Sequence, residues 1–153
     1  MQVEDYRISK LRNYLFNVIN TLTSNRNYQI NAYMLSNKID DYSLDKIPTE
    51  SIVEEYITGG GLYRDVYSFR SRKAYSQDTI DNLKNMGFFE QFENAIKTNN
   101  DEGNLPDIEG IEDIKCLSPF TMLVNNDGKS TIFDISIQIT YELDDDSSSH
   151  ISL

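Results

Sequence analysis

The stretch that decides the fold is IFDISIQITYE, residues 132–142. Apolar or aromatic side chains occupy every second position, and polar side chains occupy the positions between them. The apolar set is Phe133, Ile135, Ile137, Ile139 and Tyr141, and the polar set is Asp134, Ser136, Gln138 and Thr140. Because successive side chains of a strand point to opposite faces, this period predicts a closing strand with one face in the core and the other in water or at an interface.

A second strand-rich region lies in the middle of the chain. Residues 62–73 (LYRDVYSFRSRK) interleave aromatic residues with cations and predict a long strand whose two faces are both partly covered. Residues 51–58 predict a further strand before it, and Gly59, Gly60 and Gly61 separate the two. Since no regular element accommodates three glycines in its interior, we expect a hairpin with a flexible tip at this triplet.

The remaining strands and loops follow from shorter patterns. Residues 28–35 alternate apolar and polar side chains and predict a half-buried strand. Residues 111–116 indicate another strand, and residues 125–128 (NNDG) predict an Asp-Gly hairpin turn before the closing strand. Residues 36–50 and 98–106 have the composition of loops.

Two stretches repeat apolar residues at three- and four-residue steps, which is the spacing of one helix face. The first predicts a helix over residues 5–23, with Asp5 at the positive end of the helix dipole. The second predicts a helix over residues 76–97, with Ser76 as its N-cap and Asp78 as an early negative charge. The apolar residues at helical spacing in this second helix are Ile80, Leu83, Met86 or Gly87, Phe88, Phe89, Phe92 and Ile96.

The order helix, strand, hairpin, helix, hairpin predicts an α+β fold. Its form is a two-layer sandwich, with a mixed or antiparallel sheet and helices packed mainly on one face. The length of 153 residues suits one domain with one hydrophobic core, which we assign to residues 1–143. Residues 144–153 (DDDSSSHISL) combine a run of aspartates with a run of serines and predict an acidic, serine-rich, flexible C-terminal tail.

The charge balance favours protein partners. With 14 Lys and Arg against 25 Asp and Glu, the net charge is −11, so the average surface repels phosphate and argues against strong binding to DNA or anionic membranes. The single cysteine excludes an internal disulfide, and the sequence has neither a secretion signal nor an apolar run of about 20 residues. We expect a protein made in the bacterial or host cytoplasm.

Catalytic chemistry has few candidates in this sequence. The only histidine, His150, lies in the predicted tail, which is a poor place for a triad or a metal site. Cys116 has no visible partner base and fits a core thiol. The glycine triplet lies between two predicted strands, whereas a phosphate-binding loop joins a strand to a helix. We therefore expect no enzymatic activity and no cofactor.

Acidic pairs raise the question of a metal site. They are Asp40 with Asp41, Glu54 with Glu55, and the run Asp144 to Asp146. The NNDG segment at residues 125–128 lacks the distal glutamate of a calcium loop. Nothing in the spacing places two carboxylates across a pocket for acid and base catalysis. Solvated charge is the favoured interpretation, with no bound metal.

Four cations lie close together among aromatic residues in an otherwise acidic chain. They are Arg64, Arg70, Arg72 and Lys73, and the three arginines share strand parity and should point to one face. Interleaved cations and aromatic rings are typical of single-stranded nucleic-acid binding, but they also suit an acidic surface on another copy, or plain solvent. We favour a subunit or partner contact made by Gly59, Gly60, Gly61, Arg64, Arg70, Arg72 and Lys73.

A series of motifs extends from Gly59 to Glu142. A glycine-rich turn precedes a strand ending in F-x-S-R-x-x-Y-S, a helix with D-x-x-x-N-x-x-x-x-x-F-F-E, a G-N-L-P loop and the alternating closing strand. The matching residues are Phe69, Ser71, Arg72, Tyr75, Ser76, Asp78, Asn82, Phe88, Phe89, Glu90 and Gly103 to Pro106. This series resembles small tail-terminator proteins, also called tail-completion or minor capsid proteins, of Firmicute phages and phage-tail-like bacteriocins.

The resemblance implies a structural protein of a virion or tail-like particle. Proteins of this kind form a homo-oligomeric ring, a hexamer in the family, that caps the tail tube and joins it to the neck or collar. The implied partners are copies of the chain itself, the tail-tube and any sheath protein, and a neck or head-completion protein. The alternative is a head-closure or neck connector protein that contacts DNA or other neck proteins, with the cation cluster as the DNA contact.

Overall fold

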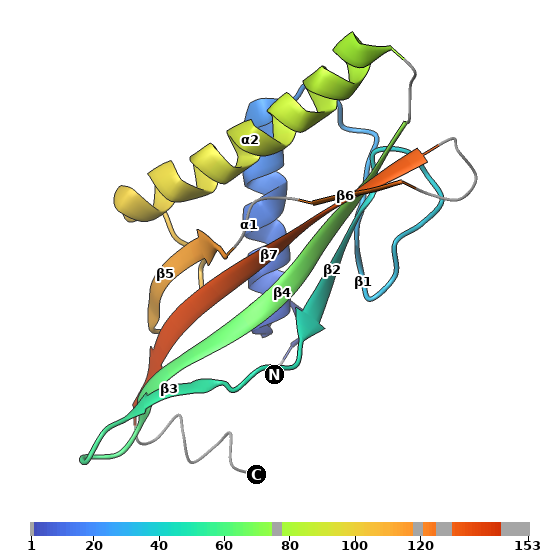
Figure 1. Ribbon diagram of the computed structural model, residues 1–153. Coiled ribbons are helices and arrows are strands. Elements are labelled where there is room, and N and C mark those ends of the chain that lie inside the picture. The colour runs from blue at the N-terminus through green and yellow to red at the C-terminus, as the bar shows by residue number, and fades with distance from the viewer. Residues whose placement is uncertain (1, 75–77, 118–120, 125–129, 145–153) are drawn as a thin grey trace.

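The computed structural model describes residues 2–74, 78–117, 121–124 and 130–144. Within these residues, seven strands form one mixed sheet, and two α-helices pack against it (Figure 1). The elements in chain order are the 3-10 helix η1 (Val3–Asp5), α1 (Arg7–Leu22), β1 (Ile30–Ala32), β2 (Tyr42–Ile47), β3 (Ile52–Glu55), β4 (Gly61–Ala74), α2 (Thr79–Asp101), β5 (Ile111–Cys116), β6 (Thr121–Val124) and β7 (Ser130–Leu143). The predicted α+β sandwich is confirmed.

Two long antiparallel strands, β4 and β7, form the axis of the sheet. They pair along their whole length, from Gly61 opposite Leu143 to Ala74 opposite Ser130. On the other edge of β4, β2 and β3 pair with its two halves, while β6 and β5 divide the outer edge of β7. β1 extends the sheet by pairing in parallel with β2. The sheet is therefore long, and the β3–β4 hairpin protrudes at one end (Figure 1).

The core lies between the helices and one face of the β4–β7 ribbon. Phe69 faces Ile135 across the two strands, and Tyr67 faces Ile137. The apolar set of the closing strand is at most 2% exposed, as its alternation predicts. Ile135, Ile137, Ile139 and Tyr141 pack with one side of each helix in a single cluster. Phe133 stacks on Phe89 of α2. In the described chain, no helix covers the opposite face of the sheet (Figure 1).

The loop predicted over residues 36–50 is wrong in its second half, which forms β2. Tyr42 and Leu44 are 2% and 1% exposed and belong to the core. Asp45 interrupts the apolar pattern of this segment, but its carboxylate accepts a hydrogen bond from Arg70 Nη2 on β4 at 2.8 Å. A cross-strand partner thus stabilises a strand whose aspartates favour loops when the segment is considered alone.

The strand predicted over residues 28–35 is shorter in the structure. β1 contains only three residues. Tyr28 and Ile30 are buried as the alternation predicts, whereas Met34 is 63% exposed. Tyr33 has a left-handed φ of 60°, a conformation that ends an extended strand.

The second helix begins and ends later than predicted. Its N-cap is Asp78, whose carboxylate accepts the Ile80 amide at 2.9 Å, while Ser76 lies outside the described residues. Residues 98–101, predicted as loop, form its last turn. The helix stops just before Gly103, whose left-handed φ of 77° lets the chain leave the helix axis.

The apolar residues of α2 do not share one buried face. Phe89, Phe92 and Ile96 are at most 2% exposed, whereas Ile80 and Leu83 are 62% and 58% exposed. The N-terminal half of the helix extends away from the sheet (Figure 1). Ile80 and Leu83 therefore do not pack in the core. The helix is as long as its spacing indicates, but only its second half packs.

Two predictions fall outside the described part of the chain. The Asp-Gly turn at residues 125–128 is one of them, although β6 and β7 on either side pair antiparallel as a hairpin requires. The other is the tail, of which only Asp144 is described, and this residue is exposed. The division into a domain over residues 1–143 and a tail over 144–153 therefore stays a prediction.

Candidate functional site

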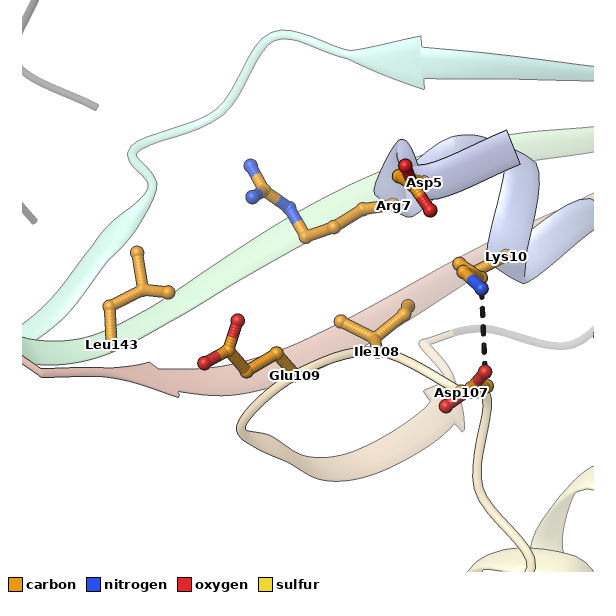
Figure 2. A pocket seen from close by; sticks show the side chains of 7 residues that line it. All are labelled: Asp5, Arg7, Lys10, Asp107, Ile108, Glu109 and Leu143. Carbon is orange, nitrogen blue, oxygen red and sulfur yellow. Dashed lines mark hydrogen bonds and ion pairs between the residues drawn. The ribbon is translucent and has the colours of Figure 1, made fainter. Parts of the chain in front are cut away.

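A hollow of about 620 Å³ lies at the start of α1, between this helix and the loop before β5 (Figure 2). Charged side chains of both signs line it, namely Arg7 and Lys10 with Asp5, Asp107 and Glu109. Lys10 Nζ lies 3.3 Å from Asp107 Oδ2, which is an ion pair within the hollow. Because cations and carboxylates are mixed, the lining does not select one sign of ligand charge.

Arg7 also belongs to a buried ionic cluster on the helix-covered face of the sheet. At its centre is Asp65 of β4, which is 1% exposed. Its carboxylate accepts hydrogen bonds from Arg7 Nε at 3.0 Å, the Tyr141 hydroxyl at 3.0 Å and the Tyr67 hydroxyl at 3.2 Å. Lys46 Nζ lies 3.5 Å from Asp65 Oδ1. Four elements, α1, β2, β4 and β7, thus meet at one carboxylate.

The cluster keeps the Asp65 carboxyl ionised and the Tyr67 and Tyr141 hydroxyls protonated at neutral pH. Burial alone would raise the pKa of the Asp65 carboxyl, but the hydrogen bond and charge of Arg7, with Lys46 and Tyr141, hold it below its usual range. Burial and the charge of Asp65 raise the pKa of Tyr67 and of Tyr141. The carboxylate is therefore an acceptor surrounded by donors, an arrangement that fastens α1 to the sheet.

The predicted contact glycines form the turn between β3 and β4. Gly59 and Gly60 have left-handed φ values of 97° and 71°. A Cβ on Gly60 would overlap the carbonyl oxygen of Leu143, and one on Gly61 would overlap that of Glu54. The hairpin itself is confirmed. Close backbone packing of Gly60 against the end of β7 and of Gly61 against β3 explains why these two positions carry no side chain. The flexibility of the tip stays a prediction.

The β3–β4 hairpin exposes apolar side chains. All four residues of β3 are exposed. Ile52 is 43% exposed, Val53 47%, and Ile57, in the turn, is fully exposed at 106%. The hairpin, which protrudes at one end of the sheet (Figure 1), therefore presents apolar side chains to its surroundings.

The three arginines of the cation cluster lie on the face of β4 opposite the helices, so the shared parity is confirmed. Their register partners on β7 are Thr140, Asp134 and Ile132, which alternate with the core residues of that strand. The guanidinium of Arg64 donates from Nε to the Glu50 carbonyl at 3.0 Å, and Arg70 pairs with Asp45. Both arginines are partly exposed, so a contact with another molecule stays a prediction for them.

Arg72 and Lys73 occupy different surroundings from those expected of contact residues. Both are only 8% exposed. Arg72 donates to the Ser36 carbonyl at 2.9 Å and to Ser130 Oγ at 2.8 Å. Both side chains are already used inside their own chain, so the assignment of Arg72 and Lys73 to a subunit contact is corrected. Parity did not reveal this burial, because the partners come from distant segments.

Lys73 is the one member of the cluster on the helix-covered face. Its ammonium lies 3.1 Å from Asp40 Oδ1 and 4.9 Å from the centre of the Phe88 ring on α2. Burial lowers the pKa of this lysine, and Asp40 opposes the shift. The ion pair ties the segment before β2 to β4, and the ring contact holds the middle of α2 against β4. A buried lysine can serve as a nucleophile, but this one is held as the cation of a pair.

The remaining candidates from the sequence are the cysteine, the acidic pairs and the histidine. Cys116 is partly buried on β5, and burial, with a contribution from Glu93, raises the pKa of its thiol to about 12, so the thiol stays protonated. Glu54 and Glu55 are exposed as predicted, but Asp41 is 4% exposed and accepts the Gln29 amide, which corrects its assignment as solvated. Among the described residues, no group of three or more His, Cys, Asp or Glu is placed to hold a metal ion. His150, Asp145 and Asp146 lie outside the described residues.

Comparisons with known proteins assign no family. No protein-family model matches the chain, and a search of curated proteins finds no match either. Among the residues that the structure describes, neither helix combines the length and the apolar character needed to cross a membrane. The resemblance to tail-terminator proteins therefore rests on the sequence motifs.

Arg72 is buried and Arg64 is partly exposed, so charge reversal at these two positions should change the free energy of unfolding by different amounts. We expect Arg72→Glu to lower the free energy of unfolding by about 2–3 kcal/mol, because it buries an unpaired carboxylate and removes two hydrogen bonds. Arg64→Glu, at a partly exposed site with one backbone acceptor, should lower it by about 1 kcal/mol or less. Urea unfolding followed by circular dichroism measures both. Equal effects would contradict the buried role of Arg72.

Proposed function

We propose that this chain is a structural assembly subunit that forms a ring on the end of a phage tail tube and joins the tube to a neck or collar. The motifs from Gly59 to Glu142 supply the resemblance to tail-terminator proteins. The single observation that carries the proposal is the protruding β3–β4 hairpin, whose apolar residues Ile52, Val53 and Ile57 stay exposed. The particle is a virion or a phage-tail-like bacteriocin assembled in the bacterial or host cytoplasm.

The hairpin supports assembly for a physical reason. An exposed apolar side chain is hydrated at a cost of about 25 cal/mol per Å² relative to burial, so an apolar projection gains stability when a partner covers it. Gly60 and Gly61 pack closely against neighbouring backbone within this projection. Backbone held by such contacts has less conformational entropy to lose on binding, which favours contact between protein surfaces.

The titratable groups support binding as the activity, with no turnover of a substrate. Asp65 already accepts three hydrogen bonds, and Lys73 forms an ion pair with Asp40. The thiol of Cys116 stays protonated at neutral pH. A catalytic base or nucleophile has to face a substrate in its reactive form, and these groups are engaged elsewhere or protonated.

A second candidate function is a neck connector that contacts DNA. One observation favours it, which is the partly exposed pair Arg64 and Arg70 on the sheet face without helices. The net charge of −11 opposes such a contact over the rest of the surface. Binding to a DNA duplex that weakens steeply with salt would favour this candidate over the ring.

The test of the proposed function removes the gene from its phage or bacteriocin cluster. We expect tails of uncontrolled length that lack a collar and fail to join heads, with normal capping restored by the wild-type gene. Electron microscopy measures the tail lengths, and labelled protein locates the chain on the particle. Normal tails without the gene, or label along the tube with none at its end, would contradict the proposal.

A further inference from the structure

The first turns of α2 carry an apolar stripe that the core does not use. We call it the outer stripe, and it consists of Ile80, Leu83, Met86 and Gly87. Ile80 precedes Phe89, and Leu83 precedes Phe92, by nine residues each, which is about two and a half helical turns. The stripe therefore lies opposite the buried phenylalanines and points away from the sheet.

Nothing in the part of the chain that the structure describes requires a glycine at position 87. A Cβ at this position would meet no atom within 4 Å, and Gly87 is not one of the glycines with a positive φ. Glycine inside a helix is less stable than alanine, so its presence here calls for another reason. It lies one turn after Leu83 on an exposed apolar face, where the missing side chain lets another molecule approach the helix closely.

The hairpin tip, defined as Ile52, Val53 and Ile57, lies at the other end of the molecule. β4 begins at the β3–β4 turn and ends shortly before α2. Its 14 residues span about 45 Å at the usual rise per residue of a strand. The β3–β4 hairpin and the start of α2 lie at opposite ends of one copy (Figure 1). A copy therefore cannot bring its own hairpin tip to its own outer stripe, whereas the tip of a second copy can reach it.

The charges around the two surfaces are complementary at one position. Glu54 and Glu55 stand beside the hairpin tip, and both are exposed. The exposed Lys84 lies one turn after Ile80, along the edge of the outer stripe, and Glu90 lies beyond the other end of the stripe. Two further carboxylates, the N-cap Asp78 and Asp81 of the first turn, are exposed but lie farther round the helix from the outer stripe. An acidic tip laid along the stripe therefore meets Lys84 at the edge of the stripe near Ile80.

We infer that the outer stripe of α2 is the docking surface for the β3–β4 hairpin tip of a second copy. Ile57 packs beside Leu83 in the space above Gly87, and Glu54 or Glu55 pairs with Lys84. Because the two surfaces differ, the contact is heterologous, and successive copies join head to tail until a ring closes. This inference rests on the proposed ring and names the surfaces that form it.

Two exposed substitutions and their mixture test the contact. Ile57→Asp destroys the tip and Leu83→Asp destroys the stripe, and each variant should keep the circular dichroism spectrum and unfolding midpoint of the wild type because both sites are exposed. Each variant alone should be monomeric by native mass spectrometry. In a mixture of the two, the intact tip of the Leu83→Asp variant can dock on the intact stripe of the Ile57→Asp variant. The mixture should therefore form a heterodimer and nothing larger. Val3→Asp, at another exposed apolar residue, should assemble as the wild type does.

The outcomes separate this inference from the proposed function. Rings formed equally well by both variants would overturn the inference and leave the ring proposal standing. The stripe could instead bind the stripe of another copy. In that case Leu83→Asp would be monomeric, Ile57→Asp would still dimerise, and the mixture would contain no heterodimer. This result also overturns the inference. A wild-type chain that stays monomeric overturns it too, whereas normal tails after gene deletion overturn the proposed function.

Gly87→Ala tests the contact in a second way, because it should change the stability of the monomer and the strength of association in opposite directions. The added methyl should raise the unfolding midpoint of monomeric protein by about 1–4 °C, since alanine favours the helix and nothing clashes with it. The same methyl fills the space over which the tip packs, so association should weaken about tenfold. A more stable helix with unchanged association would overturn the role of Gly87 in the contact.

Discussion

Ile137→Asp is expected to abolish the folded state. Ile137 lies at the centre of β7, is 0% exposed, and faces Tyr67 on one neighbouring strand and Cys116 on the other. A carboxylate at this position would be buried without a partner and would leave part of the core unfilled. Such changes cost about 4–5 kcal/mol or more, which is comparable with the whole stability of a domain of about 5–15 kcal/mol.

The control for this prediction introduces the same charge one residue earlier. Ser136 is partly exposed on the opposite face of β7, so Ser136→Asp should lower the free energy of unfolding by about 1 kcal/mol or less. Circular dichroism and urea unfolding compare the two variants. Equal losses at residues 136 and 137 would show that the closing strand does not separate a buried from an open face.

Asp65→Ala is expected to cause the second largest loss. The substitution removes the acceptor of three hydrogen bonds and leaves the hydroxyls of the buried Tyr67 and Tyr141 without this partner. Removing one member of a buried ion pair costs about 3–5 kcal/mol. Asp107→Ala is the matched control, because its carboxylate also pairs with a cation of α1 but is 96% exposed, and such pairs contribute about 0–1 kcal/mol.

The pH dependence of unfolding, compared between the wild type and Asp65→Ala, tests how the ionised Asp65 carboxylate contributes to stability. The carboxyl has a lower pKa in the folded chain than its ordinary value of 3.8, so its stabilisation is present above about pH 4 and is lost as the pH falls through the folded pKa. The difference in unfolding free energy between the wild type and Asp65→Ala should therefore be constant near neutral pH and shrink in acid. A difference that grows as the pH falls would contradict the ion-pair role.

Local periodicity determined the main elements of this fold from the sequence alone. The two-residue period of residues 132–142 assigns each side chain of β7 to a face because strand geometry alternates side chains regardless of neighbours. The glycine triplet likewise located the β3–β4 turn, since Gly59 and Gly60 adopt φ values that other residues avoid. The shared face of Arg64, Arg70 and Arg72 follows from the same alternation.

Tertiary contacts decided what periodicity leaves open. Residues 42–47 become a strand because β4 supplies a full edge of partners, including Arg70 for Asp45. The apolar residues of α2 have helical spacing throughout, but only the second half of the helix lies over the sheet. Whether a residue such as Leu83 is core or surface therefore depends on the length of helix that the sheet can cover.

The polar sites show the same division most clearly. Asp65 meets Arg7 from 58 positions away and Tyr141 from 76 positions away, and Arg72 meets the Ser36 carbonyl across 36 positions. No spacing rule connects such residues, because their proximity is created by the path of the whole chain. The sequence by itself determined which faces and turns form, since backbone geometry acts over a few residues. Only the tertiary structure decided which charges are buried and paired, and which apolar residues remain for a partner, since those outcomes require long-range contacts.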